Sequence, residues 1–251
     1  MEGSAFWAAA VLASFCVGMA KGGVPMISAI GVPVMSLVMS PVLAAGLLLP
    51  IYIVADMLGL YAYRRNFDAR VLKIMMVAMP IGVLIGYLTS ARVPESAVTL
   101  VVGLIGFWFA AATLLRRRAT DTPPQPARWR PGLFWGTITG FTSFVSHSGA
   151  APYQVYTLPL GMDKLTFAGT VTIAFAYINI VKLIPYYALG QLSVENLRVA
   201  AVLAIPAIIG VLVGVRLVKV LPEKLFFQIV VWALLLLSLR LMWSGTAELL
   251  A

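Results

Sequence analysis

Long apolar stretches separated by short polar loops run along most of the chain. They fall near residues 5–20, 24–39, 42–63, 71–90, 97–115, 132–146, 150–161, 165–188, 197–218 and 223–243. The longer ones reach the roughly 20 residues that a helix needs to cross the hydrocarbon core of a bilayer. Because an unpaired backbone group in lipid costs several kcal/mol, we expect helices, and the runs are too continuous for the strands of a membrane barrel. The pattern predicts an all-α, polytopic transmembrane bundle of about eight to ten helical segments.

Composition points to the same class of protein. The chain is 61% hydrophobic and 11% charged, whereas soluble domains carry roughly 25% charged residues. The net charge of +9 comes from basic residues in short loops, which is typical of a cytoplasmic membrane face and not of a nucleic-acid-binding surface. The sequence has one cysteine, Cys16, which excludes an internal disulfide and a cysteine-based metal cluster. We therefore expect the lipid bilayer, and no nucleic acid, around this chain.

The two halves of the chain resemble one another. Residues 82–86 read Gly-Val-Leu-Ile-Gly, and residues 210–214, which follow them by 128 residues, read Gly-Val-Leu-Val-Gly. A Pro-Glu dipeptide begins eight residues beyond the last glycine of each motif, at Pro94 and at Pro222. The shared spacing predicts an internal duplication.

A polar segment separates these halves. Residues 116–131 are rich in arginine and proline, which is typical of a solvated linker. The sequence thus predicts a first transmembrane repeat in 1–115, a cytoplasmic linker in 116–131 and a second repeat in 132–251. The basic loops follow different helices in the two halves, with Arg64, Arg65, Arg70 and Lys73 in the first and Arg216, Lys219 and Lys224 one helix later in the second. Since basic loops mark the cytoplasm, equivalent loops should lie on opposite faces, and the repeats should be inverted.

Polar interruptions stand near the start of each half. The first, in 18–25, contains Lys21, Gly22 and Gly23, and the second, in 140–152, contains Ser146, His147, Ser148 and Gly149. Paired helix breaks in inverted repeats point to a substrate site near the midplane. A broken helix leaves unpaired N–H groups with partial positive charge, to which lysine and serine add further donors. We expect these residues to bind a small anion between facing breaks.

Each of these features also has a structural interpretation. Lys21 at the turn of a full hairpin would anchor the cytoplasmic face, glycines let helices pack closely, and a lone histidine is often an interior hydrogen-bonding residue. The hairpins in 5–39 and 132–161 either cross the membrane fully or dip in and return. A catalytic metal needs about three protein ligands. One histidine and few carboxylates therefore predict no metal, and we expect no cofactor.

Asp56 is the carboxylate that lies well inside an apolar segment, where a charge should face the bundle interior or a cavity. At an offset of 123 residues it corresponds to Asn179, which shares a helix face with Lys182. We expect these residues to act in coupling or gating, with Asp56 paired to Lys21 or Lys182, or carrying a coupling proton. The alternatives are a structural hydrogen bond for Asp56 and snorkelling of Lys182 to the interface.

With these features the chain resembles the sulfite exporter (TauE/SafE) family of bacterial membrane transporters over nearly all of residues 5–243. The resemblance rests on the duplicated halves, the two breaks, the polar linker, and a proline-containing helix before each glycine motif, with Pro80 and Pro206. Breaks in the family are usually denser in glycine than those seen here. The resemblance implies a multi-pass protein of the bacterial inner membrane that transports small anions, often sulfur-containing ones or carboxylates.

The sequence contains no G-x-x-x-x-G-K-[ST] motif for ATP. We therefore expect a secondary transporter of sulfite, sulfonate or carboxylate-type anions, coupled to H⁺, Na⁺ or the membrane potential, and no enzymatic activity. The alternatives are a passive anion channel and an intramembrane enzyme with His147 as base. Against the enzyme stands the lack of a second histidine and of paired carboxylates.

Overall fold

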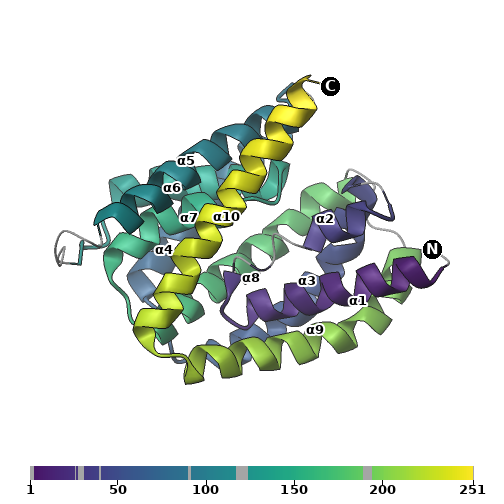
Figure 1. Ribbon diagram of the computed structural model, residues 1–251, viewed down its shortest axis with the longest axis horizontal. Helices are drawn as coiled ribbons and strands as arrows, with labels where there is room; N and C mark the ends of the chain where they lie inside the picture. Colours follow the sequence, from purple (N-terminus) through teal and green to yellow (C-terminus); the bar gives the residue numbers. More distant parts are fainter. Residues whose placement is uncertain are drawn as a thin grey trace. The chain divides into compact units, whose positions relative to one another are not determined.

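The chain is helical throughout most of its described part. A computed structural model describes residues 3–25, 27, 31–39, 41–89, 92–116, 124–188 and 194–250. Its α-helices (Figure 1) are α1 (Ser4–Lys21), α2 (Gly31–Ser36), α3 (Pro41–Tyr63), α4 (Ala69–Thr89), α5 (Glu95–Arg116), α6 (Trp129–Val145), α7 (Ala150–Thr157), α8 (Lys164–Ala188), α9 (Val194–Val220) and α10 (Glu223–Leu250). These residues contain no strand, so the predicted all-α fold is confirmed.

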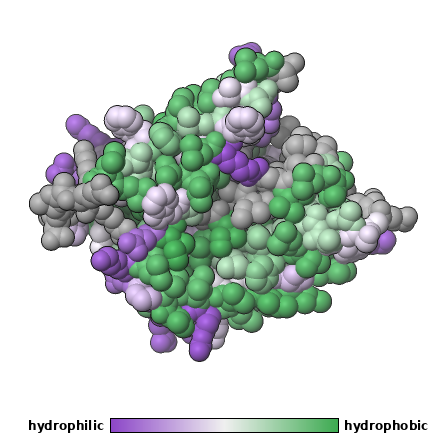
Figure 2. All heavy atoms as spheres, viewed as in Figure 1, coloured by the Kyte–Doolittle hydropathy of each residue, from purple (hydrophilic) through white to green (hydrophobic). Residues whose placement is uncertain are grey.

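Many of these helices have the length and hydrophobicity of membrane-spanning helices. Within the described ranges, seven are long and apolar enough to cross one: α1, the later part of α3, α4, α5, α8, α9 and α10. Hydrophobic residues cover much of the surface visible in Figure 2, and hydrophilic residues are confined to patches. Large apolar side chains such as Leu84, Leu212 and Trp243 are exposed, as helix faces in contact with lipid require. The predicted multi-pass membrane bundle is confirmed.

The second member of each predicted hairpin is short. α2 has six residues and α7 has eight, which gives lengths of about 9 Å and 12 Å against about 30 Å of hydrocarbon. Neither crosses the bilayer on its own. The α-helix expected over 24–39 is therefore shorter than predicted, with residues 26 and 28–30 outside the described part. α7 continues into a 3₁₀-helix, Leu158–Leu160.

The chain divides into two compact units, and each takes segments from both halves. Unit 1 is Met1–Phe67 with Ala168–Leu221, and unit 2 is Asp68–Phe167 with Pro222–Ala251. Unit 1 thus holds α1, α2, α3, α9 and most of α8, and unit 2 holds α4 to α7 and α10. The predicted repeats are a relation within the sequence and stay a prediction. Of the predicted linker, residues 117–123 lie outside the described part.

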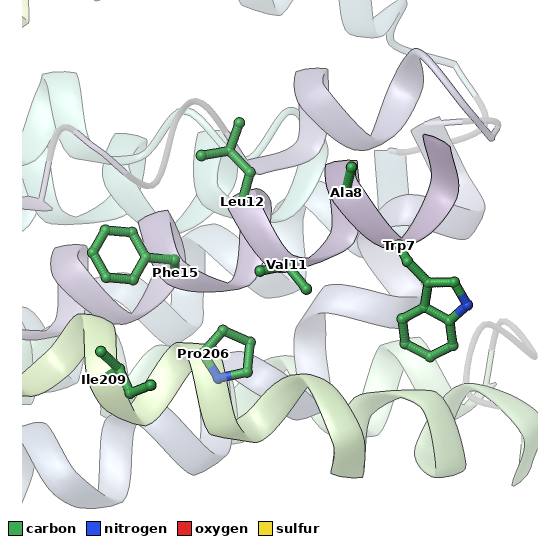
Figure 3. Close-up of a pocket in the computed structure, with 7 residues that line it drawn as sticks. All are labelled: Trp7, Ala8, Val11, Leu12, Phe15, Pro206 and Ile209. Atoms are coloured by element: carbon green, nitrogen blue, oxygen red, sulfur yellow. The ribbon is translucent and has the colours of Figure 1, made fainter. Parts of the chain in front are cut away.

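In unit 1, α9 packs along α1 and α3, and α2 packs on the same two helices (Figure 1). The core consists mainly of small and aliphatic side chains: Phe6, Ala10, Ala13, Val17, Met35, Ala44, Leu47, Leu48, Ile51, Ala200, Leu203 and Ala207. An open groove of about 620 Å³ between α1 and α9 (Figure 3) is lined by Trp7, Ala8, Val11, Leu12, Phe15, Pro206 and Ile209. This lining offers no charge to an anion, so it is not a candidate substrate site.

In unit 1, α1 packs very closely on α9, and a similar contact occurs in unit 2, where α4 packs on α6. A Cβ added to Gly18 would lie 1.9 Å from the carbonyl oxygen of Ala207, and one added to Gly140 would lie 1.9 Å from that of Met79. Gly140 follows Gly18 by 122 residues, and Ala207 follows Met79 by 128 residues. The contact between α1 and α9 therefore corresponds to the contact between α6 and α4.

A second contact, made by the glycine motifs, follows the same correspondence. A Cβ on Gly210 would lie 2.2 Å from the carbonyl oxygen of Phe15, and one on Gly82 would lie 2.0 Å from that of Thr137. Thr137 follows Phe15 by 122 residues, and Gly210 follows Gly82 by 128 residues, so both offsets are repeated. The recurrence supports the predicted duplication, whereas the inverted orientation of the halves stays a prediction.

Candidate functional site

The first predicted break begins where α1 ends, at Lys21. The three amides that follow turn back onto the last turn of α1: Gly22 N donates to Gly18 O at 2.9 Å, Gly23 N to Ala20 O at 3.1 Å, and Val24 N to Met19 O at 3.4 Å. Gly23 has a φ of 107°, where a side chain would strain the backbone. The expectation of unpaired amides here is wrong, because this part of the break is a helix C-terminus that caps its own carbonyls.

Side chains from α3 and α8 hold the carbonyl groups of this break. Tyr63 OH donates to Gly22 O at 2.6 Å, and Thr172 Oγ1 donates to Lys21 O at 3.3 Å. Gly22 lies against the backbone of α9, where an added Cβ would be 2.6 Å from Val211 O. Contacts with α3, α8 and α9 therefore fix the end of α1. The same contacts fix the backbone position of Lys21.

The Lys21 ammonium lies in an interior site built by α3 and α8. Its Nζ is 2.7 Å from Asp56 Oδ1, and the two side chains are 7% and 1% exposed. The rings of Tyr52 and Phe175 have centroids 5.2 Å and 5.9 Å from Nζ. A carboxylate and two ring faces thus replace the water that the ammonium loses on burial. Such burial does not fit the alternative in which Lys21 is a solvated anchor at a loop.

Asp56 receives a second donor from α8. Asn179 Nδ2 donates to Asp56 Oδ2 at 2.7 Å, whereas Oδ1 forms the ion pair with Lys21, so nitrogen atoms from two different helices contact the carboxylate. Lys182 lies three residues beyond Asn179 on α8 and is 3% exposed. This burial does not fit a lysine that snorkels to the interface. Of the two partners considered for Asp56, the structure pairs it directly with Lys21.

Lys21, Asp56, Asn179 and Lys182 together form what we call the lysine–aspartate cluster. The cluster contains two amino groups and one carboxyl group, so its basic groups outnumber its acidic groups by one. Burying each ion costs several kcal/mol unless pairing offsets the cost, and an ionisable group inside a membrane helix is a mark of a transport pathway. In the described residues no group of histidine, cysteine and carboxylate side chains is arranged to hold a metal ion.

The second predicted break lies in unit 2, between α6 and α7. The amides of Ser146 and Ser148 both donate to the carbonyl oxygen of Thr142, at 3.0 Å and 3.3 Å. The hydroxyl groups of the two serines form a hydrogen bond with each other. The end of α6 is therefore capped, and the serine hydroxyls are held together just before α7 begins.

His147 lies between these serines in a strained backbone conformation. Its φ of 52° falls in the left-handed region, which costs a residue other than glycine roughly 1–2 kcal/mol. Gly149 follows as the residue before α7, and residues 150–154 of that short helix are buried. Strain of this kind persists only where the surrounding structure imposes it, and it is concentrated at functional sites.

The structure places the predicted residues in two groups. Unit 1 brings together Lys21, Asp56, Asn179 and Lys182, with Gly22 and Gly23 beside them. Unit 2 contains Ser146, His147, Ser148 and Gly149. That both groups bind one substrate stays a prediction. Sequence reasoning did not identify Tyr52, Tyr63, Thr172 or Phe175 as neighbours of this site. Phe175 has no polar group that could signal such a role.

Comparison with known proteins gives one match. The family model of the sulfite exporter TauE/SafE matches residues 6–241, a stretch that contains the lysine–aspartate cluster and both breaks. No curated protein and no solved structure matches the chain. The matched family consists of membrane transporters and not enzymes, which agrees with the helices described above. We conclude that this chain belongs to the sulfite exporter TauE/SafE family.

Proposed function

We propose that this protein is a secondary transporter that moves small organic or sulfur-containing anions, of the sulfite, sulfonate or carboxylate type, across the bacterial inner membrane. The observation that carries the proposal is the lysine–aspartate cluster. Two buried lysines, Lys21 and Lys182, and the carboxylate of Asp56, which pairs with Lys21, lie in helices long and apolar enough to cross a membrane.

The cluster favours an anion for electrostatic reasons. An uncompensated charge in a low-dielectric interior attracts a counter-ion far more strongly than the same charge in water. Ammonium groups also form hydrogen bonds to oxyanions that are about twice as strong as bonds between neutral groups. The excess of basic groups beside Asp56 therefore favours a substrate with a compact negative oxygen group.

The second break adds donors of the same kind. Ser146 and Ser148 supply hydroxyl groups, and the chain then enters α7, whose N-terminus carries a partial positive charge. We propose that these groups also serve anion binding. Within each unit the donors surround a chain break, which is the arrangement that transporters with discontinuous helices use for charged substrates.

The test is a thermal-shift screen of the purified protein against sulfite, methanesulfonate, sulfate and short carboxylates. A bound anion stabilises the folded state by about 2.7 kcal/mol at a concentration of 100 times its Kd. Lys21→Ala should weaken binding of the best anion about tenfold or more, because a hydrogen bond to a charged group contributes about 1.5–3 kcal/mol. Lys224→Ala, which removes an exposed lysine at the start of α10, should bind as the wild type does.

Lys21→Ala also leaves Asp56 without its partner, and breaking a buried ion pair costs about 3–5 kcal/mol of stability. The double variant Lys21→Ala, Asp56→Asn removes both charges and gives a folded reference. If this double variant binds anions as tightly as the single variant Asp56→Asn does, Lys21 is not a substrate-binding residue.

A further inference from the structure

The carboxylate of Asp56 is held as a bound oxyanion would be. Lys21 Nζ lies 2.7 Å from Oδ1 and Asn179 Nδ2 lies 2.7 Å from Oδ2. The donors come from α1 and α8, whereas Asp56 itself is on α3. Two donors from separate helices therefore converge on one planar group with two oxygens, which is the geometry that recognition of a carboxylate or sulfonate requires.

The pair also lies at a special place in the duplicated sequence. Asp56 and Asn179 are 123 residues apart, which is the offset that aligns their two segments. The rings beside the Lys21 ammonium, Tyr52 and Phe175, are 123 residues apart as well. When two halves of a chain are equivalent, equivalent residues meet only around the axis that relates them. The cluster therefore marks the point that both halves share, where a transporter built from repeats binds its substrate.

We propose that Lys21 Nζ and Asn179 Nδ2 are donors of the substrate oxyanion site, and that Asp56 occupies this site as an internal anion until a proton neutralises it. The inference rests on the proposed function and extends it to the coupling ion. A proton from the aqueous side binds a carboxylate oxygen of Asp56, the neutral carboxyl group loses its hold on the ammonium, and the substrate oxyanion takes its place. Each bound anion is thus accompanied by one bound proton.

The groups that face Asp56 are compatible with this exchange. From α1 come Lys21 and, next to Tyr52, Cys16; from α3 comes Tyr52; and from α8 come Asn179 and Lys182. The residues of α9 at the α1 break are Val211, Gly214 and Val215, and the sequence of α2 has no titratable side chain. Neutral Asp56 leaves the two ammonium groups with no facing carboxylate among these residues, which strengthens their attraction for an external anion.

The same geometry sets the class of substrate. An anion that replaces the Asp56 carboxylate must offer one oxygen to the ammonium and another to the amide. Acetate and methanesulfonate have such oxygens, whereas chloride is a single atom and cannot span both donors. Loss of a hydrogen bond to a charged group predicts binding of chloride that is weaker by about tenfold or more.

The test measures the affinity of the full chain in detergent for methanesulfonate, which stays ionised across the range from about pH 8 to about pH 6. If one proton accompanies each anion while Asp56 is ionised in the free protein, the Kd falls about tenfold per pH unit as the pH is lowered. Asp56→Asn removes the competing charge, so it should bind about tenfold more tightly or better at about pH 8, with no dependence on pH. Glu223→Gln, at an exposed carboxylate in unit 2, should keep the slope of the wild type.

Each outcome bears on the assignment. A wild-type Kd that is the same at both pH values, or an Asp56→Asn variant that binds more weakly than the wild type, would overturn it, because a merely structural Asp56 helps to position Lys21. Chloride binding as tight as methanesulfonate would overturn the two-donor site. If Asp56→Asn does not fold, the pH series is repeated in Lys182→Gln and in His147→Gln, and loss of the slope in either variant would overturn the assignment to Asp56. Failure of the wild type to bind any tested anion at any pH would instead reject the proposed function.

Discussion

Asn179 follows Asp56 by the 123-residue offset of the predicted duplication, so a faithful repeat would have a second aspartate there. Two carboxylates at this distance would repel one another, and one of them would have to be neutral. An asparagine instead supplies an N–H group to Asp56, at 2.7 Å. At two positions that the predicted repeats make equivalent, this difference replaces a repulsive contact with a hydrogen bond.

The sequence revealed the members of this cluster but not their contacts. Helical periodicity places Asn179 and Lys182 on one face of a segment, and Asp56 on a face of another, yet it does not say which faces meet. The useful signal is that Asp56 and Asn179 are separated by the repeat offset of 123 residues. That separation predicts a contact only if the repeats are related by an axis passing between them. A lysine beside glycines fits a solvated turn as well as a buried ion pair, so the sequence pattern leaves the environment of Lys21 open.

At His147, glycine and alanine substitutions separate backbone strain from side-chain function. The φ of 52° suits glycine, so His147→Gly should be about 1 kcal/mol more stable than His147→Ala. Thermal unfolding in detergent measures this difference. If the imidazole also contacts the substrate, both variants should bind anions more weakly than the wild type. Anion affinities equal to that of the wild type would assign His147 to structure alone.

At the scale of elements, glycines set how closely the helices approach. In α4, a Cβ on Gly82 would lie 2.0 Å from a backbone oxygen of Thr137, whereas one on Gly86 would meet the side chain of Phe144 at 3.0 Å. A backbone cannot move aside as a side chain does, so Gly82→Ala should cost about 1–3 kcal/mol and Gly86→Ala less. Gly210→Ala, the counterpart of Gly82→Ala, should cost about as much as Gly82→Ala does.

Thermal unfolding of the purified variants in one detergent checks this ranking. The two substitutions in α4 form a matched pair, since they lie one turn apart and add the same methyl group. Equal melting temperatures for Gly82→Ala and Gly86→Ala would contradict the close backbone contact between α4 and α6. A large effect at Gly82 without one at Gly210 would contradict the correspondence between the two halves.

Hydropathy predicted the positions of the long helices, but it did not predict which helices pack against one another. The segment predicted at 71–90 is α4 (Ala69–Thr89), and that at 165–188 is α8 (Lys164–Ala188). These ends are easy to predict because polar residues or glycine border each apolar run. The partners of α1 and α6 were not predicted, because lipid-facing and protein-facing sides of such helices are equally apolar. Glycines at Gly18 and Gly140 were read as parts of breaks, although they also mark helix contacts.

For the whole molecule, the two compact units cut across the two predicted repeats. Unit 1 contains α1 to α3 from the first half and α9 from the second, and unit 2 contains α4 and α5 from the first half and α6, α7 and α10 from the second. A division of the sequence at the polar linker does not predict these units, because helices from both sides of the linker pack together in each unit. Each unit nevertheless contains one break and one close contact between glycine-bearing helices.

Proton exchange at Asp56 determines which gradient drives transport. The empty cluster contains ionised Asp56, and the loaded cluster contains neutral Asp56 with one monoanion, so the two states carry the same net charge. A cycle that alternates between them moves one proton with each monoanion and no net charge. Accumulation should therefore follow the pH gradient and ignore the membrane potential. For a monoanion that crosses alone, by contrast, about 60 mV amounts to about 1.4 kcal/mol, or tenfold in concentration.

Reconstituted vesicles distinguish these cases. A pH difference of about one unit should drive about tenfold accumulation of methanesulfonate towards the alkaline side, where the transported proton is released. A potassium diffusion potential of about 60 mV, imposed with valinomycin at equal pH, should drive none. Asp56→Asn should lose the response to pH. Accumulation that follows the voltage and ignores the pH gradient would instead identify a uniporter or a passive anion channel, and Asp56 would then serve only to position Lys21.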